Sequence, residues 1–405
     1  MNNLYNRVIT DEIEKYLRTD DIIVLHGARQ VGKTSLLYIL ENRLKQADEA
    51  TYYIDLEDSR YVKLLDAGVG EFVKHLREEG LQPANQKKKL YVFIDEIQYL
   101  ANPSSFLKLT ADHHKGIKLI VSGSSSFAIK SKFKDSLVGR TVDFEIHTLS
   151  FQEFLAFKQY PFEKGRLFTQ KKIDELRNQF KEYALYGGYP KIVLTPEFDK
   201  KERYLQQIID TYVKKDIRDL ANVKDVDKFN KLLETLSSQS GQLLNIAELS
   251  NTVNIAKQTV EKYLFILENT YIIKLVRPFS GNLRSELFKT PKVFFYDSGL
   301  MQMLWLRSLQ KELLGNVFET SVFSELIKKY GKAAVYYWRT KDKKEIDFVL
   351  KDRKATLPIE VKLRFEQFKP TAITYFMAQY KGNNFKVVGL NGAPVGEHQV
   401  YPWDI

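Results

Sequence analysis

The eight residues from Gly27 to Thr34 constrain the fold of this chain more than any other segment. They read Gly-x-x-x-x-Gly-Lys-Thr, after an apolar stretch at 21–26 and before a helical pattern at 35–46. Glycines let the backbone approach an anion closely, and the amides of the loop and of the following helix point toward it. A strand, this loop and a helix in that order predict a phosphate-binding loop.

The residues of this Walker A pattern have separate expected roles. Lys33 is expected to reach the β- and γ-phosphates of a nucleotide, and Thr34 is expected to ligate Mg²⁺. The expected nucleotide-binding residues are Gly27, Ala28, Arg29, Gln30, Val31, Gly32, Lys33, Thr34 and Ser35. A chance glycine-rich turn is a poor alternative, because both the strand and the helix are present.

A second apolar run, at 90–94, ends in the carboxylates Asp95 and Glu96. This is a Walker B pattern, in which Asp95 holds the magnesium shell and Glu96 orients or deprotonates the attacking water. Strand-like runs at 51–57, 118–122 and 141–147 alternate with helical patterns, which predicts an α/β fold with a parallel sheet. The acid directly after the Walker B aspartate resembles the pattern of P-loop ATPases rather than GTPases, and this resemblance, not a base-reading motif, implies ATP.

Two further residues are candidates for contacting the transferred phosphate. Ser124, or the nearby Ser122, follows the strand after Walker B and could contact the γ-phosphate or the water, although a small-residue turn is as good an explanation. Arg140 could stabilise phosphate charge within its own chain or in a neighbouring subunit. A lone arginine is more often a member of a surface ion pair.

At this point the chain resembles a bacterial and archaeal family of AAA-like P-loop ATPases, relatives of the archaeal-type ATPases. The matching segments are GARQVGKTSLL, FIDEIQYL, SGSSSF, SLVGR, LSFQEFL and YGGYP. The resemblance extends over nearly the whole chain, including a C-terminal domain of uncharacterised function. It implies ATP and Mg²⁺ as cofactors and a mechanical or signalling role, but it implies no substrate.

The middle of the chain divides into two expected parts. Residues 150–230 carry Leu, Phe and Tyr at helical spacing and are interpreted as a helical lid or adaptor packed on the ATPase. Residues 231–297 predict a helix, a short helix, a third helix and a hairpin, which is the order of a winged helix-turn-helix. Lys257, Gln258 and Lys262 would face DNA from the third helix. Such modules also bind proteins.

Residues 298–405 predict a small α/β domain that resembles the PD-(D/E)xK nuclease core. Asp347 lies on one expected strand, and Glu360 and Lys362 lie two residues apart on the next, so the latter two face the same side. Two carboxylates and a lysine could bind a second metal ion and activate water. Glu325, or alternatively Glu319, could complete the site from the preceding helix. An ordinary surface strand is the alternative explanation.

The whole sequence therefore predicts an ATPase domain at 1–149, a lid at 150–230, a winged helix at 231–297 and a nuclease-like domain at 298–405. The chain has 405 residues, no cysteine and a net charge of +11, which favours a cytoplasmic protein with a polyanionic partner. No apolar run approaches the roughly 18 residues of a membrane span. The preferred function is an ATP-driven switch or motor acting on DNA. A signalling ATPase with protein-binding modules, an ATP-regulated nuclease, and assembly as a homo-oligomer remain open.

Overall fold

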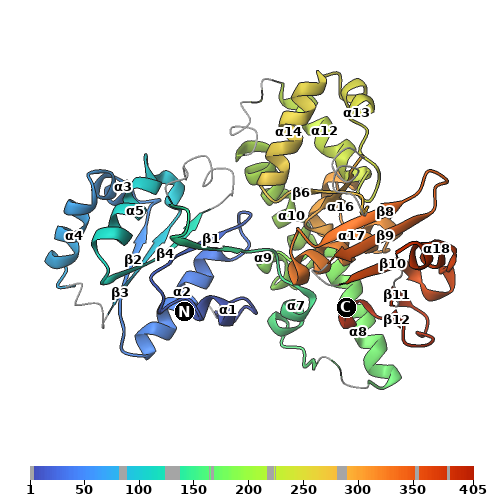
Figure 1. The fold of residues 1–405 in the computed structure, drawn as a ribbon, viewed down its shortest axis with the longest axis horizontal. Coiled ribbons are helices and arrows are strands. Elements are labelled where there is room, and N and C mark those ends of the chain that lie inside the picture. The colour runs from blue at the N-terminus through green and yellow to red at the C-terminus, as the bar shows by residue number, and fades with distance from the viewer. Residues whose placement is uncertain are drawn as a thin grey trace. The chain divides into compact units, whose positions relative to one another are not determined.

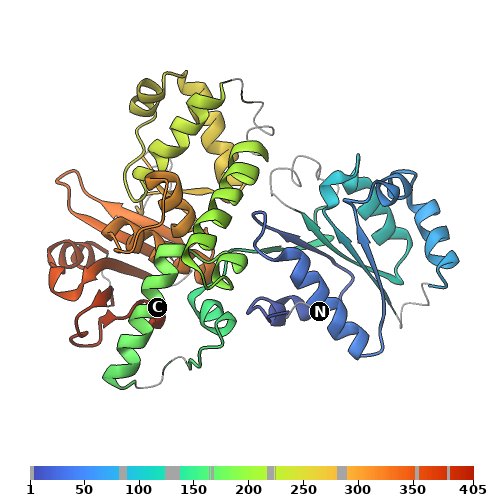
Figure 2. The ribbon, with the colours of Figure 1, turned by 180° about the vertical axis from the view of Figure 1, so that it is seen from behind.

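The structure is a computed structural model that describes residues 4–81, 89–123, 137–163, 165, 168–216, 223, 225–280, 290–351, 355–380 and 384–405. The chain divides into two compact units, Met1–His147 and Thr148–Ile405 (Figures 1 and 2). Ser124 lies outside the described residues.

The first unit is built on a five-stranded parallel sheet with the order β2-β3-β4-β1-β5. Its strands are β1 (Ile22–His26), β2 (Ala50–Asp55), β3 (Leu90–Asp95), β4 (Ile117–Gly123) and β5 (Thr141–Glu145). Every residue of β3 and β4 is buried, as expected for a parallel sheet covered by helices. The expected α/β fold with a parallel sheet is confirmed.

Helices connect these strands. They are α1 (Thr10–Glu14), α2 (Lys33–Gln46), α3 (Ser59–Asp66), α4 (Val69–Glu78), the short 3₁₀ turn η1 (Ile97–Tyr99) and α5 (Pro103–His113). Helix α2 packs on β2, β3 and β4, and α5 packs on β4. Asn102 caps α5 by accepting a hydrogen bond from the Ser105 amide, with proline at the first helical position.

The second unit begins with α7 (Phe151–Phe157), α8 (Gln170–Tyr186), α9 (Pro190–Val193) and α10 (Phe198–Ile208), followed by a π-helical segment, η3 (Ile209–Asp216). Ser150 and Glu153 form a capping box at the start of α7. Helix α8 packs on α16 (Ser298–Leu306) and α17 (Gly315–Tyr330). The helices expected to form a lid on the ATPase domain therefore belong to the second unit.

Three helices and a hairpin follow: α12 (Val226–Ser238), α13 (Ile246–Val253), α14 (Lys257–Asn269), and the antiparallel strands β6 (Ile273–Val276) and β7 (Lys292–Phe295). Asp225 and Asn245 cap α12 and α13. The helices α12, α13 and α14 form a group beside the larger sheet of this unit (Figure 1).

That larger sheet has the order β12-β11-β10-β9-β8. Its strands are β8 (Val335–Arg339), β9 (Glu345–Lys351), β10 (Thr356–Arg364), β11 (Lys386–Asn391) and β12 (Gln399–Val400). Strands β8, β9 and β10 form an antiparallel meander, and β11 runs parallel to β10 after helix α18 (Thr371–Tyr380). Helix α17 packs on β7, β8 and β10. Short 3₁₀ turns, η4 (Phe365–Gln367) and η5 (Pro402–Asp404), complete the unit.

Among the residues that the structure describes, no helix has both the length and the apolar character needed to span a membrane.

Candidate functional site

The loop between β1 and α2 has the backbone conformation that an anion-binding loop needs. Gln30 and Gly32 both have positive φ, 61° and 98°, on either side of the buried Val31. Gly32 is the N-cap of α2 and, without a side chain, cannot cap the helix. The first amides of this 14-residue helix therefore have no side-chain acceptor from their own cap residue, which leaves them available to phosphate oxygens.

Close packing against the segment after β5 is a second reason why the first residue of the loop, Gly27, is a glycine. A Cβ atom at Gly27 would lie 2.1 Å from the carbonyl oxygen of Ile146, which follows β5. The Ile146 amide also donates to the His26 carbonyl over 2.7 Å. Gly27 thus allows the segment leaving β5 to pack directly on the loop, in addition to the approach to phosphate expected from the sequence.

Lys33 is buried and is held over the loop. Its ammonium donates to the carbonyls of Gly27 (3.2 Å) and Ala28 (2.8 Å). Burial lowers the pKa of Lys33 to about 8, although the nearby Glu96 and Asp95 oppose the shift. A buried ammonium with a lowered pKa is stabilised by an added anion, so the position suits a nucleotide phosphate. Arg29 acts in the opposite sense to the two acids and lowers the Lys33 pKa further.

The Asp95 carboxylate joins helix α2 and strands β2 and β4. Its Oδ2 accepts hydrogen bonds from the hydroxyls of Thr34 (2.6 Å) and Tyr53 (3.1 Å). Its Oδ1 accepts from the hydroxyl of Ser122 and from the Glu96 amide (3.1 Å). The two residues expected to surround Mg²⁺, Thr34 and Asp95, therefore lie in direct contact although 61 positions separate them in the chain.

Glu96 lies in the left-handed region of the backbone, with φ 55° and ψ 48°. A non-glycine residue in this region is strained, and such strain is concentrated at functional sites. Gln98 donates a side-chain hydrogen bond to the Glu96 carboxylate. The turn explains how two adjacent acids at the end of β3 both come close enough to Lys33 to affect its pKa.

Sequence reasoning missed Tyr53 and gave Ser122 second place. Strand β4 lies between β1 and β3, so Ser122, which pairs with Leu25 of β1, is next to Asp95. Burial and the charge of Asp95 raise the pKa of Tyr53, so its phenol stays protonated and donates to that carboxylate. A hydroxyl at the carboxyl end of β2 was the only signal for Tyr53.

Arg140 lies at the other end of the sheet from the P-loop. It immediately precedes β5, whose first residue, Thr141, pairs with Ile22 at the start of β1. The five residues of β1 span about 16 Å before the P-loop begins. Arg140 forms an ion pair with Asp112 over 2.9 Å. The expectation of a phosphate contact within the same chain is therefore wrong, and the alternative of a surface ion pair fits.

Three residues predicted for the C-terminal site come together in the second unit. The Lys362 ammonium lies 2.6 Å from the Glu360 carboxylate and 3.4 Å from that of Asp347. Asp347 also accepts a hydrogen bond from the Val361 amide over 2.7 Å. Burial and the charge of Asp347 raise the pKa of Glu360. Strands β9 and β10 thus present two carboxylates bridged by one lysine.

A second lysine, which the sequence did not indicate, pairs with two neighbouring carboxylates. Lys292 of β7 is 2% exposed and lies 2.5 Å from Glu345 and 3.9 Å from Glu319. Burial alone would lower the pKa of Lys292, but Glu319, Asp347 and Glu345 together raise it. Burial and Asp347 raise the pKa of Glu319. The hairpin thus supplies a counter-charge to the larger sheet.

The expected contribution of Glu325 to this site is wrong. Its carboxylate accepts hydrogen bonds from the Phe151 amide (3.0 Å) and from the hydroxyl of Tyr183 (2.5 Å). Positions 319 and 325 are six residues apart on α17, which at 100° per residue places them about 120° apart around the helix. Glu319 therefore faces the carboxylate cluster, and Glu325 faces α7 and α8.

This cluster does not fit a metal ion in its present arrangement. Within the described parts of the chain, no three acidic or histidine side chains are placed to hold one. The space between Asp347 and Glu360 is bridged by the Lys362 ammonium, and Lys292 and Arg339 pair with the neighbouring Glu345. These three cations offset part of the negative charge of the acids.

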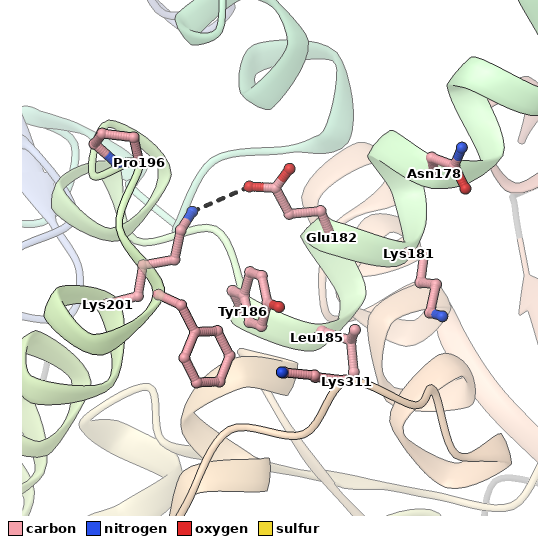
Figure 3. Close-up of a pocket in the computed structure, with 9 residues that line it drawn as sticks. Asn178, Lys181, Glu182, Leu185, Tyr186, Pro196, Lys201 and Lys311 are labelled. Carbon is pink, nitrogen blue, oxygen red and sulfur yellow. Dashed lines mark hydrogen bonds and ion pairs between the residues drawn. The ribbon is translucent and has the colours of Figure 1, made fainter.

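A separate pocket of about 380 Å³ lies between α8, α10 and the segment after α16 (Figure 3). Lys181, Tyr186, Lys201 and Lys311 contribute to its lining. The Lys201 ammonium donates to Glu182 (3.0 Å) and to the Ile192 carbonyl (3.3 Å), as the dashed line to Glu182 in Figure 3 shows in part. Lys201 is thus already hydrogen-bonded within the protein.

Comparisons with known proteins cover most of the chain. Residues 19–155 match the family described as AAA domain, residues 177–312 match a domain of unknown function (DUF8612), and residues 314–398 match another (DUF4143). An uncharacterised protein of Haemophilus influenzae is 30% identical over 388 residues, which are 93% of this chain and 90% of the relative. An uncharacterised protein of Methanocaldococcus jannaschii is 28% identical over 352 residues, 85% of this chain and 75% of the relative.

Among solved structures, AMPPCP-bound DnaA from Aquifex aeolicus aligns with 66% of this chain and 89% of that chain, at 17% identity and a TM-score of 0.30. A similarity at this level carries no functional weight. The family match over the P-loop unit and the relative aligned along nearly its full length carry the assignment. The chain belongs to a family of AAA-domain proteins with uncharacterised members in bacteria and archaea.

Proposed function

We propose that this protein is an ATP-driven switch or motor that acts on DNA. The observation that carries the ATP part is the 2.6 Å hydrogen bond between Thr34 and Asp95. It brings the end of the Walker A loop and the end of the Walker B strand together, as a shared magnesium ion requires. AAA-type domains, to which residues 19–155 belong, provide the family context.

The residues of the first unit have distinct proposed roles in hydrolysis. Loop residues Gly27 to Ser35 would hold the phosphates, with Lys33 as their buried cation. Thr34 and Asp95 would hold Mg²⁺, which neutralises phosphate charge when bound. Glu96 would accept a proton from the attacking water, and Gln98 orients its carboxylate. Ser122 and Tyr53 fix the Asp95 carboxylate by hydrogen bonds.

The DNA part rests on helix α14 and on the net charge of +11. Helices α12, α13 and α14 followed by the β6–β7 hairpin match the order of a winged helix-turn-helix. Lys257, Gln258 and Lys262 are all exposed near the start of α14. In such modules the N-terminal part of the third helix contacts bases and phosphates.

A signalling ATPase with protein-binding modules is the rival function. Phe265, on the same face of α14 as Lys262, is 57% exposed, and an exposed aromatic side chain suits a protein partner. The two functions differ in their response to DNA. Hydrolysis that double-stranded, single-stranded or branched DNA stimulates favours the first, and a specific protein complex without that response favours the second.

Salt-dependent DNA binding is the test of the DNA part. The affinity of the protein for a fluorescent DNA duplex should fall with salt, with a slope of about −0.9 in log affinity against log salt for each phosphate contact. Reversing the charge of Lys257 and Lys262 to glutamate should weaken binding at least about tenfold and make the slope shallower.

The matched control reverses two exposed lysines of the first unit, Lys63 and Lys74, and so changes the net charge by the same amount. It should weaken binding less than the α14 variant does. Equal losses of DNA affinity in the two variants would show that binding depends on net charge alone and not on helix α14. No binding at low salt, with or without ATP, would remove the DNA function.

A further candidate function concerns the C-terminal sheet, for which we propose a nuclease-like fold. Helix α17, the meander β8–β9–β10, helix α18 and the parallel strand β11 give the order αβββαβ around Asp347, Glu360 and Lys362. Because Lys362 occupies the space between Asp347 and Glu360 where a metal ion would bind, we favour DNA binding over cleavage for this domain.

A cleavage assay with Mn²⁺ separates these outcomes. We expect no cleavage of linear or branched DNA above background by the intact protein. Cleavage that is lost in Asp347→Asn, and retained in the control Asp342→Asn at the exposed turn before β9, would show an active nuclease and contradict this expectation.

A further inference from the structure

Arg7 ties the P-loop to the last residues of the first unit. Its side chain is buried, with 6% exposure. One guanidinium nitrogen donates to the Val31 carbonyl over 2.9 Å, and another donates to the His147 carbonyl over 3.0 Å. The guanidinium is a rigid planar fork with several N–H groups, so it holds two separate carbonyls in a fixed relation.

Val31 lies in the part of the loop where the backbone conformation is unusual. It lies between two positive-φ residues, Gln30 and Gly32, in the segment that would wrap the phosphates. The other end of the tie, His147, follows Ile146, whose backbone packs on Gly27 and His26. The exit segment therefore contacts the start of the loop directly and is linked to Val31 through Arg7.

Leu149, two residues after His147, is hydrogen-bonded within the second unit. The Leu149 amide donates to the Gly188 carbonyl over 2.7 Å. The Leu149 carbonyl accepts from the Lys328 ammonium (2.8 Å) and from the Tyr183 hydroxyl (3.0 Å), which shares its one proton between this carbonyl and the Glu325 carboxylate. Tyr183 belongs to α8 and Lys328 to α17, so two helices of the second unit fix this one residue.

We propose that Arg7 is a positioning residue that passes the nucleotide state of the P-loop to the second unit through Thr148. This inference rests on the proposed binding of ATP. Only Thr148 separates the held carbonyl of His147 from the held amide of Leu149. Two Cα–Cα steps span at most about 7.6 Å, so a movement of His147 reaches Leu149 across a single residue. Nucleotide binding at the loop would shift the Val31 carbonyl and, through Arg7, the His147 carbonyl. The shift would reach helices α8 and α17 through their contacts with Leu149.

Hydrogen–deuterium exchange of the full chain tests this path. In the natural protein, Mg²⁺ and a non-hydrolysable ATP analogue should change the exchange rates of α8 and α17 peptides at least about threefold. Arg7→Gln should bind the analogue with a Kd within about threefold of the natural protein and lose most of that change. Arg43→Gln is the matched control, because Arg43 pairs with Glu14 and Asn6 in the same unit.

Tyr183→Phe tests the same path from the second unit, in case Arg7→Gln folds poorly. It removes a hydroxyl donor to Leu149 far from the nucleotide in the sequence, and it should also reduce the change in α17 with nucleotide affinity retained. A full change in both variants would overturn the role of Arg7 and Leu149. Analogue binding to the natural protein with no change beyond His147 would overturn the coupling itself. Absence of analogue binding would overturn the proposed ATP function instead.

Discussion

The lowered pKa of Lys33 makes a specific prediction for nucleotide binding. Burial lowers this pKa to about 8. Below that pH the ammonium is present and attracts phosphate, whereas above it the amine is neutral unless binding restores the proton. ATP affinity should therefore be nearly constant from pH 7 to 8 and weaken above pH 8, approaching tenfold for each pH unit.

Isothermal titration calorimetry at pH 8.5 in buffers of different ionisation enthalpy measures the same effect directly. Binding should take up protons, because the phosphates raise the Lys33 pKa. Affinity that stays flat to pH 10, with no proton uptake, would contradict the account of this side chain.

The sequence predicted those residues of the candidate nucleotide site that belong to continuous motifs, and their binding roles remain proposals. Thr34 and Asp95 are in contact as their motifs require. Ser122 and Tyr53 could not be ranked in advance, because their closeness to Asp95 depends on the strand order, with β4 inserted beside β3 and β2 on its other side. Lys292 was missed for the same reason, since it reaches Glu345 and Glu319 from another element.

At the scale of elements, close backbone packing explains why the segment 186–190 contains glycine at position 188. A Cβ atom at Gly188 would lie 2.4 Å from the Leu149 carbonyl oxygen, and one at Gly299 would lie 2.3 Å from the Tyr186 backbone. Asp297 caps α16 through the Leu300 amide and also accepts from the Gly188 amide over 2.8 Å. The end of α8, the start of α16 and the segment before α7 therefore pack backbone to backbone.

Gly188→Ala should destabilise the protein by about 2 kcal/mol or more, because the new methyl group meets backbone rather than a movable side chain. The control is Gly315→Ala at the start of α17, where a Cβ atom meets nothing within 4 Å. That change should be neutral or stabilising by up to about 1 kcal/mol. Thermal or denaturant unfolding measures the stability of both variants. Equal stabilities would contradict the explanation that Gly188 is required by close backbone packing.

The sequence could not predict which unit the helices of residues 150–230 would join. The pattern of 150–230 predicted amphipathic helices, and α7, α8 and α10 are present. Their apolar faces could have packed on either neighbour, because periodicity identifies a buried face but not the surface that covers it. The aromatic residues Phe151, Phe180 and Tyr183 pack together within the second unit.

At the scale of the whole molecule, one P-loop unit is joined through Thr148 to a larger unit that contains the α14 helix and the carboxylate cluster. In the proposed function, the first unit supplies a conformational change and the second supplies the contact with DNA. If the two units are coupled, nucleotide binding and DNA binding should change each other's affinity by the same factor. DNA that stimulates turnover should also bind more tightly in one nucleotide state than in another.

The most direct measurement of the central claim is Mg²⁺-dependent ATP turnover by the full chain, with and without DNA. The natural protein should hydrolyse ATP. Glu96→Gln should bind ATP and lose about a hundredfold or more in rate, because its general base is gone. Lys33→Ala should lose tight binding, and the control Glu57→Gln, an exposed acid after β2, should behave as the natural protein. Normal turnover by Glu96→Gln would contradict the assignment of the base, and no turnover by the natural protein in any condition would contradict the proposed ATPase.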